Sequence, residues 1–110
     1  MKKFYCEGLG LALESESKAK AGYQVVTLRA GDSVLDLFEA TPTNPAPLAN
    51  LSEEHFCLRA TGSSIYDVIA TLKRKGMEPT QAEVNRGAGG KGLSTFVRDP
   101  DGNKIEIKVD

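Results

Sequence analysis

Alternating and helically spaced apolar residues predict two successive sets of elements along the chain. The first set is a short helix and three strands, expected over residues 2–8, 9–14, 23–29 and 34–39. The helix is expected to stop near Gly8 and Gly10, because glycine readily takes the conformation that ends a helix. Residues 15–22 are polar and are predicted to form a loop. Gly31 marks a turn between the last two strands, which therefore form a hairpin.

The second set is a strand, a helix and three more strands. The first strand is expected over residues 55–60, and the helix follows Ser63 and runs to about Lys75. The last three strands are expected over residues 78–84, 93–98 and 104–109. The apolar face of the helix consists of Ile65, Val68, Ile69 and Leu72. Ser63 or Ser64 can cap its first N–H groups, and Gly76 follows its last turn. Residues 99–102 (DPDG) join the last two strands, because proline and glycine both favour a tight turn.

Two segments without regular periodicity connect these elements. Residues 41–53 contain three prolines and are interpreted as a surface connection between the halves of the chain. Residues 86–92 (RGAGGKG) are rich in glycine, which raises the question of a phosphate-binding loop. Such loops lead from a strand into a helix N-terminus, whereas this segment leads into a strand and lacks a final G-K-[ST]. A hairpin or lid loop is therefore predicted here.

The two halves of the chain repeat one pattern. Residues 25–37 (VVTLRAGDSVLDL) parallel residues 95–107 (TFVRDPDGNKIEI), since each has an apolar strand ending in arginine, a glycine turn and a carboxylate between apolar residues. The repeat predicts an α+β fold of two βαβββ-type modules in a pseudo-twofold arrangement, the first module lacking its first strand. We expect a single domain over the whole chain. Its parts are a first half-module at 1–40, the connection at 41–53 and a second half-module at 54–110.

Strand alternation assigns candidate site residues to the sheet faces. The apolar face of the last strand consists of Ile105, Ile107 and Val109, so Glu106 lies on the opposite face. By the same reasoning, Asp36 and His55 lie opposite the apolar sides of their own strands. Because the helices are needed to cover the apolar faces, the polar faces are expected to line one concave, shared cavity. That arrangement brings three potential metal ligands onto related strands.

Charge and cysteine content limit the possible partners. The chain carries 14 basic and 15 acidic residues and has no basic stripe, which argues against nucleic-acid binding. No apolar run approaches the roughly 20 residues that span a bilayer, so no membrane partner is expected. Cys6 and Cys57 lie far apart and form no C-x-x-C pair. They are interpreted as reduced thiols in a cytoplasmic protein.

The sequence resembles the vicinal-oxygen-chelate superfamily, which includes glyoxalases, bleomycin-resistance proteins and extradiol dioxygenases. The most specific stretch is residues 94–107 (STFVRDPDGNKIEI), which is similar to the closing hairpin of that family. The motifs RGAGG, HFCLRA and FYCEGLG also match in kind, so the resemblance covers nearly the whole chain. In this family the missing first strand would lie ahead of the KKFYCEGLG helix, and the chain starts at Met1 within or just ahead of that helix.

The resemblance implies ligands for one divalent metal: Zn, Ni, Mn, Fe or Co. Members with a metal take ligands from the first and last strands of each module, which implies His55 and Glu106, with Asp36 at the corresponding position of the first module. A site with two histidines and one carboxylate cannot be built from one chain, because the sequence holds a single histidine. Glu106 can instead act as a general base that removes a proton next to a carbonyl. The other interpretation is structural: His55 hydrogen-bonds within the cavity while the carboxylates pair with nearby basic residues, namely Arg29, Arg59, Arg98 or Lys108.

Other side chains are candidates for contacting a ligand. Phe38 and Phe96 suit a planar or apolar ligand or serve as packing, and Phe96 stands where many of the metalloenzymes carry tyrosine. Arg59 and Arg98 can bind an anionic group, although an arginine beside a DPDG turn often serves the turn itself. Cys57 is a possible soft ligand or nucleophile, and the preferred interpretation is a buried spectator thiol.

We expect a small-molecule-binding protein of the glyoxalase and bleomycin-resistance type, with its ligand in a cavity between sheet modules of a homodimer. The alternative is a metal-dependent enzyme, a lyase or isomerase, transferase or dioxygenase, acting on a substrate with two neighbouring oxygens. A third possibility is a degenerate member whose unpaired sheet edge favours aggregation. The sequence leaves the question of catalysis open.

Overall fold

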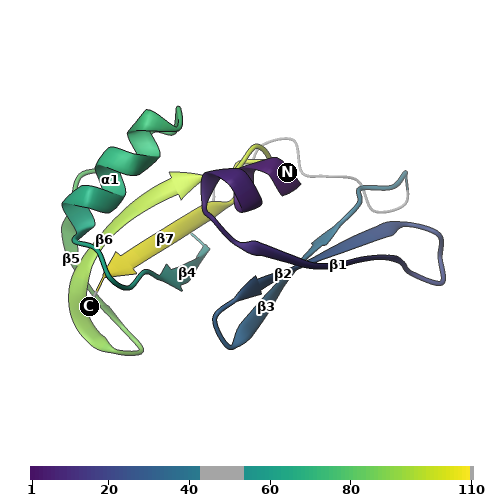
Figure 1. The fold of residues 1–110 in the computed structure, drawn as a ribbon, viewed down its shortest axis with the longest axis horizontal. Coiled ribbons are helices and arrows are strands. Elements are labelled where there is room, and N and C mark those ends of the chain that lie inside the picture. Colours follow the sequence, from purple (N-terminus) through teal and green to yellow (C-terminus); the bar gives the residue numbers. More distant parts are fainter. Residues whose placement is uncertain (43–53, 110) are drawn as a thin grey trace. The chain divides into compact units, whose positions relative to one another are not determined.

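The computed structural model describes residues 1–42 and 54–109. Most of the predicted connection, residues 43–53, therefore lies outside the described residues. The chain divides into two compact units, Met1–Ala49 and Asn50–Asp110, and each has its own sheet (Figure 1). The described residues form seven strands and one α-helix, which confirms the predicted α+β class. No helix among the described residues is long and apolar enough to cross a membrane.

The first unit contains a short helical turn followed by three strands, as the sequence predicts. They are η1 (Phe4–Gly8), β1 (Ala12–Lys18), β2 (Gln24–Ala30) and β3 (Ser33–Phe38). The backbone N–H of Leu9 donates to the carbonyl of Phe4 at 3.0 Å, which is the wider spacing of a π-helix. The three strands form an antiparallel sheet in the order β1-β2-β3.

The first strand differs from the prediction. A strand was expected over residues 9–14 and a loop over 15–22, but β1 runs from Ala12 to Lys18. Ser15, Ser17 and Lys18 are held by pairing with β2, and the register shifts between Leu13 and Ser15. Backbone hydrogen bonds to β2 thus extend β1 beyond the residues in which apolar and polar side chains alternate.

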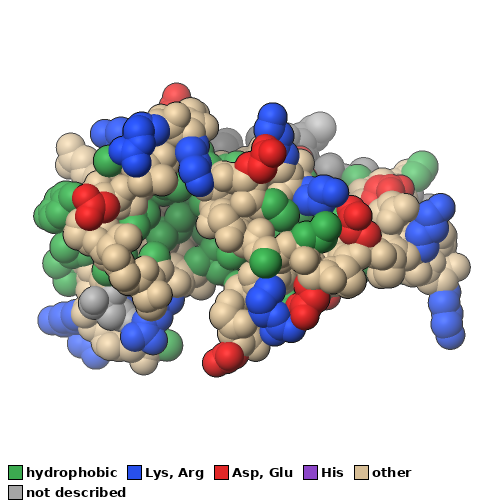
Figure 2. All heavy atoms as spheres, viewed as in Figure 1, with side chains coloured by type: hydrophobic (Ala, Val, Ile, Leu, Met, Phe, Trp, Pro, Cys, Tyr) green, Lys and Arg blue, Asp and Glu red, His purple; other side chains and the backbone are tan. Residues whose placement is uncertain are grey.

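Surface ion pairs accompany β1, whose residues are all exposed. Lys2 lies 3.0 Å from Glu16, and Nη2 of Arg29 lies 2.7 Å from the carboxylate of Glu14. Basic and acidic side chains are accordingly interspersed over the visible face of this sheet (Figure 2). The hydrogen bond that Arg29 donates to Glu14 raises the pKa of Arg29, and the one that Lys2 donates to Glu16 raises the pKa of Lys2. Exposed pairs of this kind contribute little to stability.

The second unit contains a strand, the α-helix and three strands, again in the predicted order. They are β4 (His55–Arg59), α1 (Ile65–Arg74), β5 (Glu83–Gly87), β6 (Gly90–Arg98) and β7 (Lys104–Val109). The sheet order is β4-β7-β6-β5, so the first and last strands of the unit are neighbours. β4 runs parallel to β7, and the other pairs are antiparallel.

Ser64 rather than Ser63 caps α1. Its hydroxyl accepts a hydrogen bond from the N–H of Asp67 at 3.2 Å, and Gly76 follows the last turn with a φ of 87°. The helix lies against one face of the four-stranded sheet (Figure 1). The core there is formed by buried apolar residues, namely Ile65, Leu72, Val97, Ile105 and Ile107.

The glycine-rich segment is mostly strand. A strand was expected over 78–84 and a loop over 86–92, but β5 begins only at Glu83 and β6 already begins at Gly90. Gly87 pairs with Gly90, which leaves a two-residue turn between the strands. The prediction of a hairpin was therefore right, while the predicted bounds of its strands were wrong.

The turn between β6 and β7 is held by Asp99, which is buried. Its Oδ1 accepts hydrogen bonds from the N–H groups of Asp101 and Asn103 at 3.0 and 2.9 Å. Its Oδ2 accepts one from Nδ2 of Asn103 at 2.9 Å. The DPDG turn therefore depends on its first residue as well as on its proline and glycine.

Candidate functional site

Strand register places one set of polar residues on the face of the four-stranded sheet opposite α1. Across β4, β7 and β6, the register partners form three rows: His55, Lys104 and Arg98; Cys57, Glu106 and Phe96; and Arg59, Lys108 and Ser94. Alternation puts the apolar partners, such as Ile105 and Val97, on the helix side. We call the face that carries these three rows the polar face. β7 runs along its centre, and its four inner residues are all buried.

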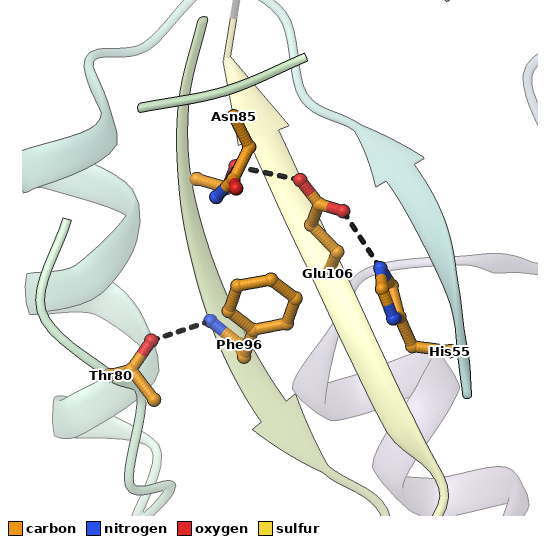
Figure 3. A network of polar contacts seen from close by, with 6 residues as sticks. His55, Thr80, Asn85, Phe96 and Glu106 are labelled. Carbon is orange, nitrogen blue, oxygen red and sulfur yellow. Dashed lines mark hydrogen bonds and ion pairs between the residues drawn. The ribbon is translucent and has the colours of Figure 1, made fainter. Parts of the chain in front are cut away.

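A hydrogen-bonded network runs across the polar face through Glu106 (Figure 3). Nε2 of His55 lies 3.1 Å from Oε1 of Glu106. The hydroxyl of Ser94 donates to Oε2 at 2.7 Å and accepts from Nδ2 of Asn85 at 3.1 Å. The network joins four strands, because these residues come from β4, β7, β6 and β5 respectively.

Glu106 is much more buried than its histidine partner. Its side chain is 8% exposed, whereas that of His55 is 34% exposed. The hydroxyl of Ser94 donates to one carboxylate oxygen, and Nε2 of His55 lies within hydrogen-bond distance of the other. Both oxygens of the buried carboxylate are thereby paired. Glu106 is held in place, and His55 is its most accessible contact.

Phe96 lies next to this network. Its ring centroid is 5.3 Å from that of His55 in an edge-to-face arrangement, and Nζ of Lys104 lies 4.5 Å from the ring centroid. The backbone N–H of Phe96 donates to the hydroxyl of Thr80 at 3.0 Å (Figure 3). β5 starts only at Glu83 and does not reach this position. Thr80 therefore provides the hydrogen-bond acceptor for the backbone N–H of Phe96.

The structure separates the predicted ligand-contacting residues into two groups. Cys57, Arg59, Phe96 and Arg98 belong to the second unit, on the polar face. Cys57 is exposed, which corrects the preferred interpretation as a buried thiol. Nη1 of Arg98 donates to the carbonyl of Gly102 at 2.9 Å, so this arginine does serve the turn.

Asp36 and Phe38 belong to the first unit, on β3. The carboxylate of Asp36 accepts a hydrogen bond from the hydroxyl of Thr27 at 2.6 Å. Phe38 is 60% exposed, and its ring centroid lies 6.0 Å from that of Tyr23. Their role in a shared cavity stays a prediction.

Two of the three predicted metal ligands come together. The nitrogen of His55 and the oxygen of Glu106 are 3.1 Å apart, which is a hydrogen-bond distance. Zinc sites in proteins have three or four protein ligands, and the described residues hold no group of three His, Cys, Asp or Glu side chains placed to bind a metal ion. The described part of the second unit therefore does not fit a metal by itself, and no metal chemistry is derived from it.

Sequence reasoning missed two members of the network. Ser94 lies two residues before Phe96 on the same strand, so alternation from Phe96 would have placed it on the polar face. Asn85 was placed between a predicted strand and a loop, and nothing in its local pattern pointed to Ser94. Its role follows only from the pairing of β5 with β6.

Comparisons with known proteins agree with this architecture. Virulence protein STM3117 of Salmonella typhimurium is 33% identical over 110 residues, which cover 96% of this chain and 71% of that protein. The crystal structure of a glyoxalase family protein from Enterococcus faecalis matches with a TM-score of 0.67 and 28% identity, covering 97% of this chain and 84% of that one. TnmS3, an antibiotic-binding protein from Streptomyces sp. CB03234, matches in fold with a TM-score of 0.72 at 22% identity, covering 98% and 82%.

A family model also matches most of the chain. Residues 1–107 match the model of the Glyoxalase/Bleomycin resistance protein/Dioxygenase superfamily. The matched range contains the three-stranded sheet, the four-stranded sheet as far as Ile107, and every residue of the network around Glu106. The chain therefore belongs to the Glyoxalase/Bleomycin resistance protein/Dioxygenase superfamily.

Proposed function

We propose that this protein binds a small organic molecule on the polar face of its four-stranded sheet. The observation that carries the proposal is the buried carboxylate of Glu106, held between His55 and Ser94 beside the ring of Phe96. Removing an unpaired carboxylate from water costs roughly several kcal/mol. A sheet face that served packing alone would avoid this cost by carrying apolar residues. A few convergent polar groups around an aromatic ring are typical of ligand sites.

The ligand contacts in this proposal come from the polar face of the second unit. Phe96 provides apolar contact, and His55 provides the accessible end of the network. Cys57, Arg59 and Arg98 lie on the same polar face and are further candidate contacts. TnmS3, an antibiotic-binding protein, has a similar fold, which supports a small organic molecule as the partner of this protein.

A ligand screen with site variants tests this function. Small aromatic compounds are screened by thermal shift, because a ligand that binds only the folded protein raises its stability by about 2.7 kcal/mol at 100 times its dissociation constant. Phe96→Ala is expected to abolish the shift. Tyr66→Ala is the matched control, since Tyr66 is a 65% exposed aromatic residue on α1. The proposal would be contradicted if Phe96→Ala and Tyr66→Ala reduced the thermal shift equally, or if Phe96→Ala left binding unaffected.

We further propose that the protein acts as a homodimer in the cytoplasm. Large apolar side chains of the first unit are exposed, namely Leu13, Val34 and Phe38, and a second subunit would cover such surface. Neither Cys6 nor Cys57 forms a disulfide among the described residues, which fits a reducing compartment. Sedimentation equilibrium at tens of micromolar protein tests the dimer. A monomer throughout that range would rule it out.

A metal-dependent enzyme is the second candidate function. The proximity of His55 and Glu106 favours it, because these are the ligand positions that the superfamily implies. The test soaks the protein with Zn, Ni, Mn, Fe or Co, dialyses it and measures metal content. Metal retained by the wild type and by Glu83→Gln, but lost in His55→Ala, would support this function. Protein that retains none of these metals would exclude it, and Asp36→Asn tests the third predicted ligand.

A further inference from the structure

Basic side chains stand directly opposite one another at both ends of the polar face. Lys104 of β7 is the register partner of Arg98 of β6, and Arg59 of β4 is the register partner of Lys108 of β7. Like charges at directly opposed positions destabilise a sheet. Two such pairs on one face therefore need an explanation beyond the stability of the sheet.

Basic residues outnumber acidic ones at the described strand positions of the polar face. Among the strand positions of the polar face in the described residues, the acidic ones are Glu83 and Glu106. Glu106 is already bound by His55 and Ser94. At these strand positions, four basic residues thus stand beside two acidic ones.

The two basic pairs differ in accessibility. Lys108 is 3% exposed and its side chain lies close to Gly87, where an added Cβ would come within 3.2 Å of its Cδ and Cε atoms. Lys104 is half-buried and Arg98 is exposed. Arg59 is exposed but its partner Lys108 is buried, so of these two pairs only Lys104 and Arg98 can both be reached by a ligand.

Lys104 also touches the aromatic part of the face. Its Nζ lies 4.5 Å from the centroid of the Phe96 ring. An acid group bound by Lys104 would therefore lie beside that ring. An ammonium has three N–H donors, so it can keep its contacts within the fold and bind a ligand oxygen as well.

We propose that the ligand is an organic anion, with an aromatic or other planar body against Phe96 and a carboxylate or phosphate held by Lys104 and Arg98. This inference rests on the proposed function and names its ligand class. The bound anion would offset the repulsion between the two cations. Lys104 is then the residue that determines specificity, since Arg98 also holds the carbonyl of Gly102.

Four probes that share one ring system test the inference: 2-naphthoate, 2-naphthyl phosphate, 2-naphthalenemethanol and 2-naphthylmethylamine. Binding is followed by NMR titration of the signals of Phe96 and its neighbours. We expect either acid to bind at least about tenfold more tightly than the alcohol, the ratio expected for one charge-assisted hydrogen bond. The tighter of the two acids identifies the acid group.

Variants of Lys104 separate charge recognition from folding. Lys104→Met is expected to remove the preference for acids while leaving alcohol binding unchanged, and Lys104→Glu is expected to reverse it in favour of the amine. Lys91→Met is the control, because Lys91 is an exposed lysine of β6 on the opposite face and its loss changes the net charge equally. Melting curves check that each variant folds.

The outcomes distinguish the inference from the function on which it rests. Wild-type protein that binds acid and alcohol equally, or a Lys104→Met variant that keeps the preference for acids, overturns the inference and leaves small-molecule binding intact. Wild-type protein in which none of the four probes shifts the Phe96 signals contradicts both.

Discussion

Nε2 of His55 lies 3.1 Å from Oε1 of Glu106, although the two residues are 51 positions apart in the chain. The parallel pairing of β4 with β7 brings the two residues together. The direct register partner of Glu106 is Cys57, not His55. The contact is thus a diagonal one across two strands. It ties the edge of the sheet to its centre.

Glu106→Ala is expected to lower the free energy of unfolding by about 1–3 kcal/mol, because it leaves the buried hydroxyl of Ser94 without its acceptor. Urea unfolding measures the change. Glu83→Ala is the control, as an exposed carboxylate of the same sheet whose loss should change stability by at most about 0.5 kcal/mol. Equal effects of the two substitutions would show that the network contributes no stability.

Thr80→Val is expected to speed hydrogen exchange at the amide of Phe96, because it removes the hydroxyl that accepts this N–H. The cost in stability should be about 0.5–1.5 kcal/mol. NMR-detected exchange measures the first effect and urea unfolding the second. Thr80→Ser keeps the hydroxyl and should restore slow exchange. Unchanged exchange in the valine variant would contradict the assigned hydrogen bond.

Ser64→Ala is expected to destabilise the protein by about 0.5–2 kcal/mol, since Ser64 caps the N-terminus of α1 through the N–H of Asp67. Thermal and urea unfolding measure the loss. Ser63→Ala, one residue earlier, removes the same atoms from a position that does not cap the helix. A larger effect at Ser63 than at Ser64 would show that the cap is assigned to the wrong serine.

Asp99→Ala is expected to cost about 1.5–3 kcal/mol, because three hydrogen bonds within the turn end on this buried carboxylate. Urea unfolding again provides the measurement. Asp101→Ala is the control, because Asp101 contacts Asp99 through its backbone N–H, which alanine keeps. The turn would not depend on Asp99 if both variants were equally stable.

Much of the fold could be predicted from local pattern. The order of elements, the cap at Ser63 or Ser64, and the DPDG turn all follow from residue type and spacing. The predictions failed where a neighbouring strand decides the conformation. Lys18 is in a strand because it pairs with Gln24, and Gly90 is in a strand because a tight turn brings it opposite Gly87. Neither pairing is visible in the local alternation of apolar residues.

The candidate site was predictable to a similar extent. Alternation placed Glu106 and His55 on polar faces, and the superfamily resemblance suggested that they act together. Their direct contact required the adjacency of β4 and β7, which no local pattern reveals. Asn85 joined the site only through its partner on β6, so its contribution depends on tertiary structure.

The adjacency of the first and last strands of the second unit has a consequence for how the protein is made. β4 leaves the ribosome early but cannot pair until β7 has been synthesised, so its contacts are of high sequence separation and form late in folding. β7 is also the strand that carries Glu106. The binding face and the completed sheet should therefore appear in the same cooperative event, and a nascent chain that stops before Lys104 should have neither.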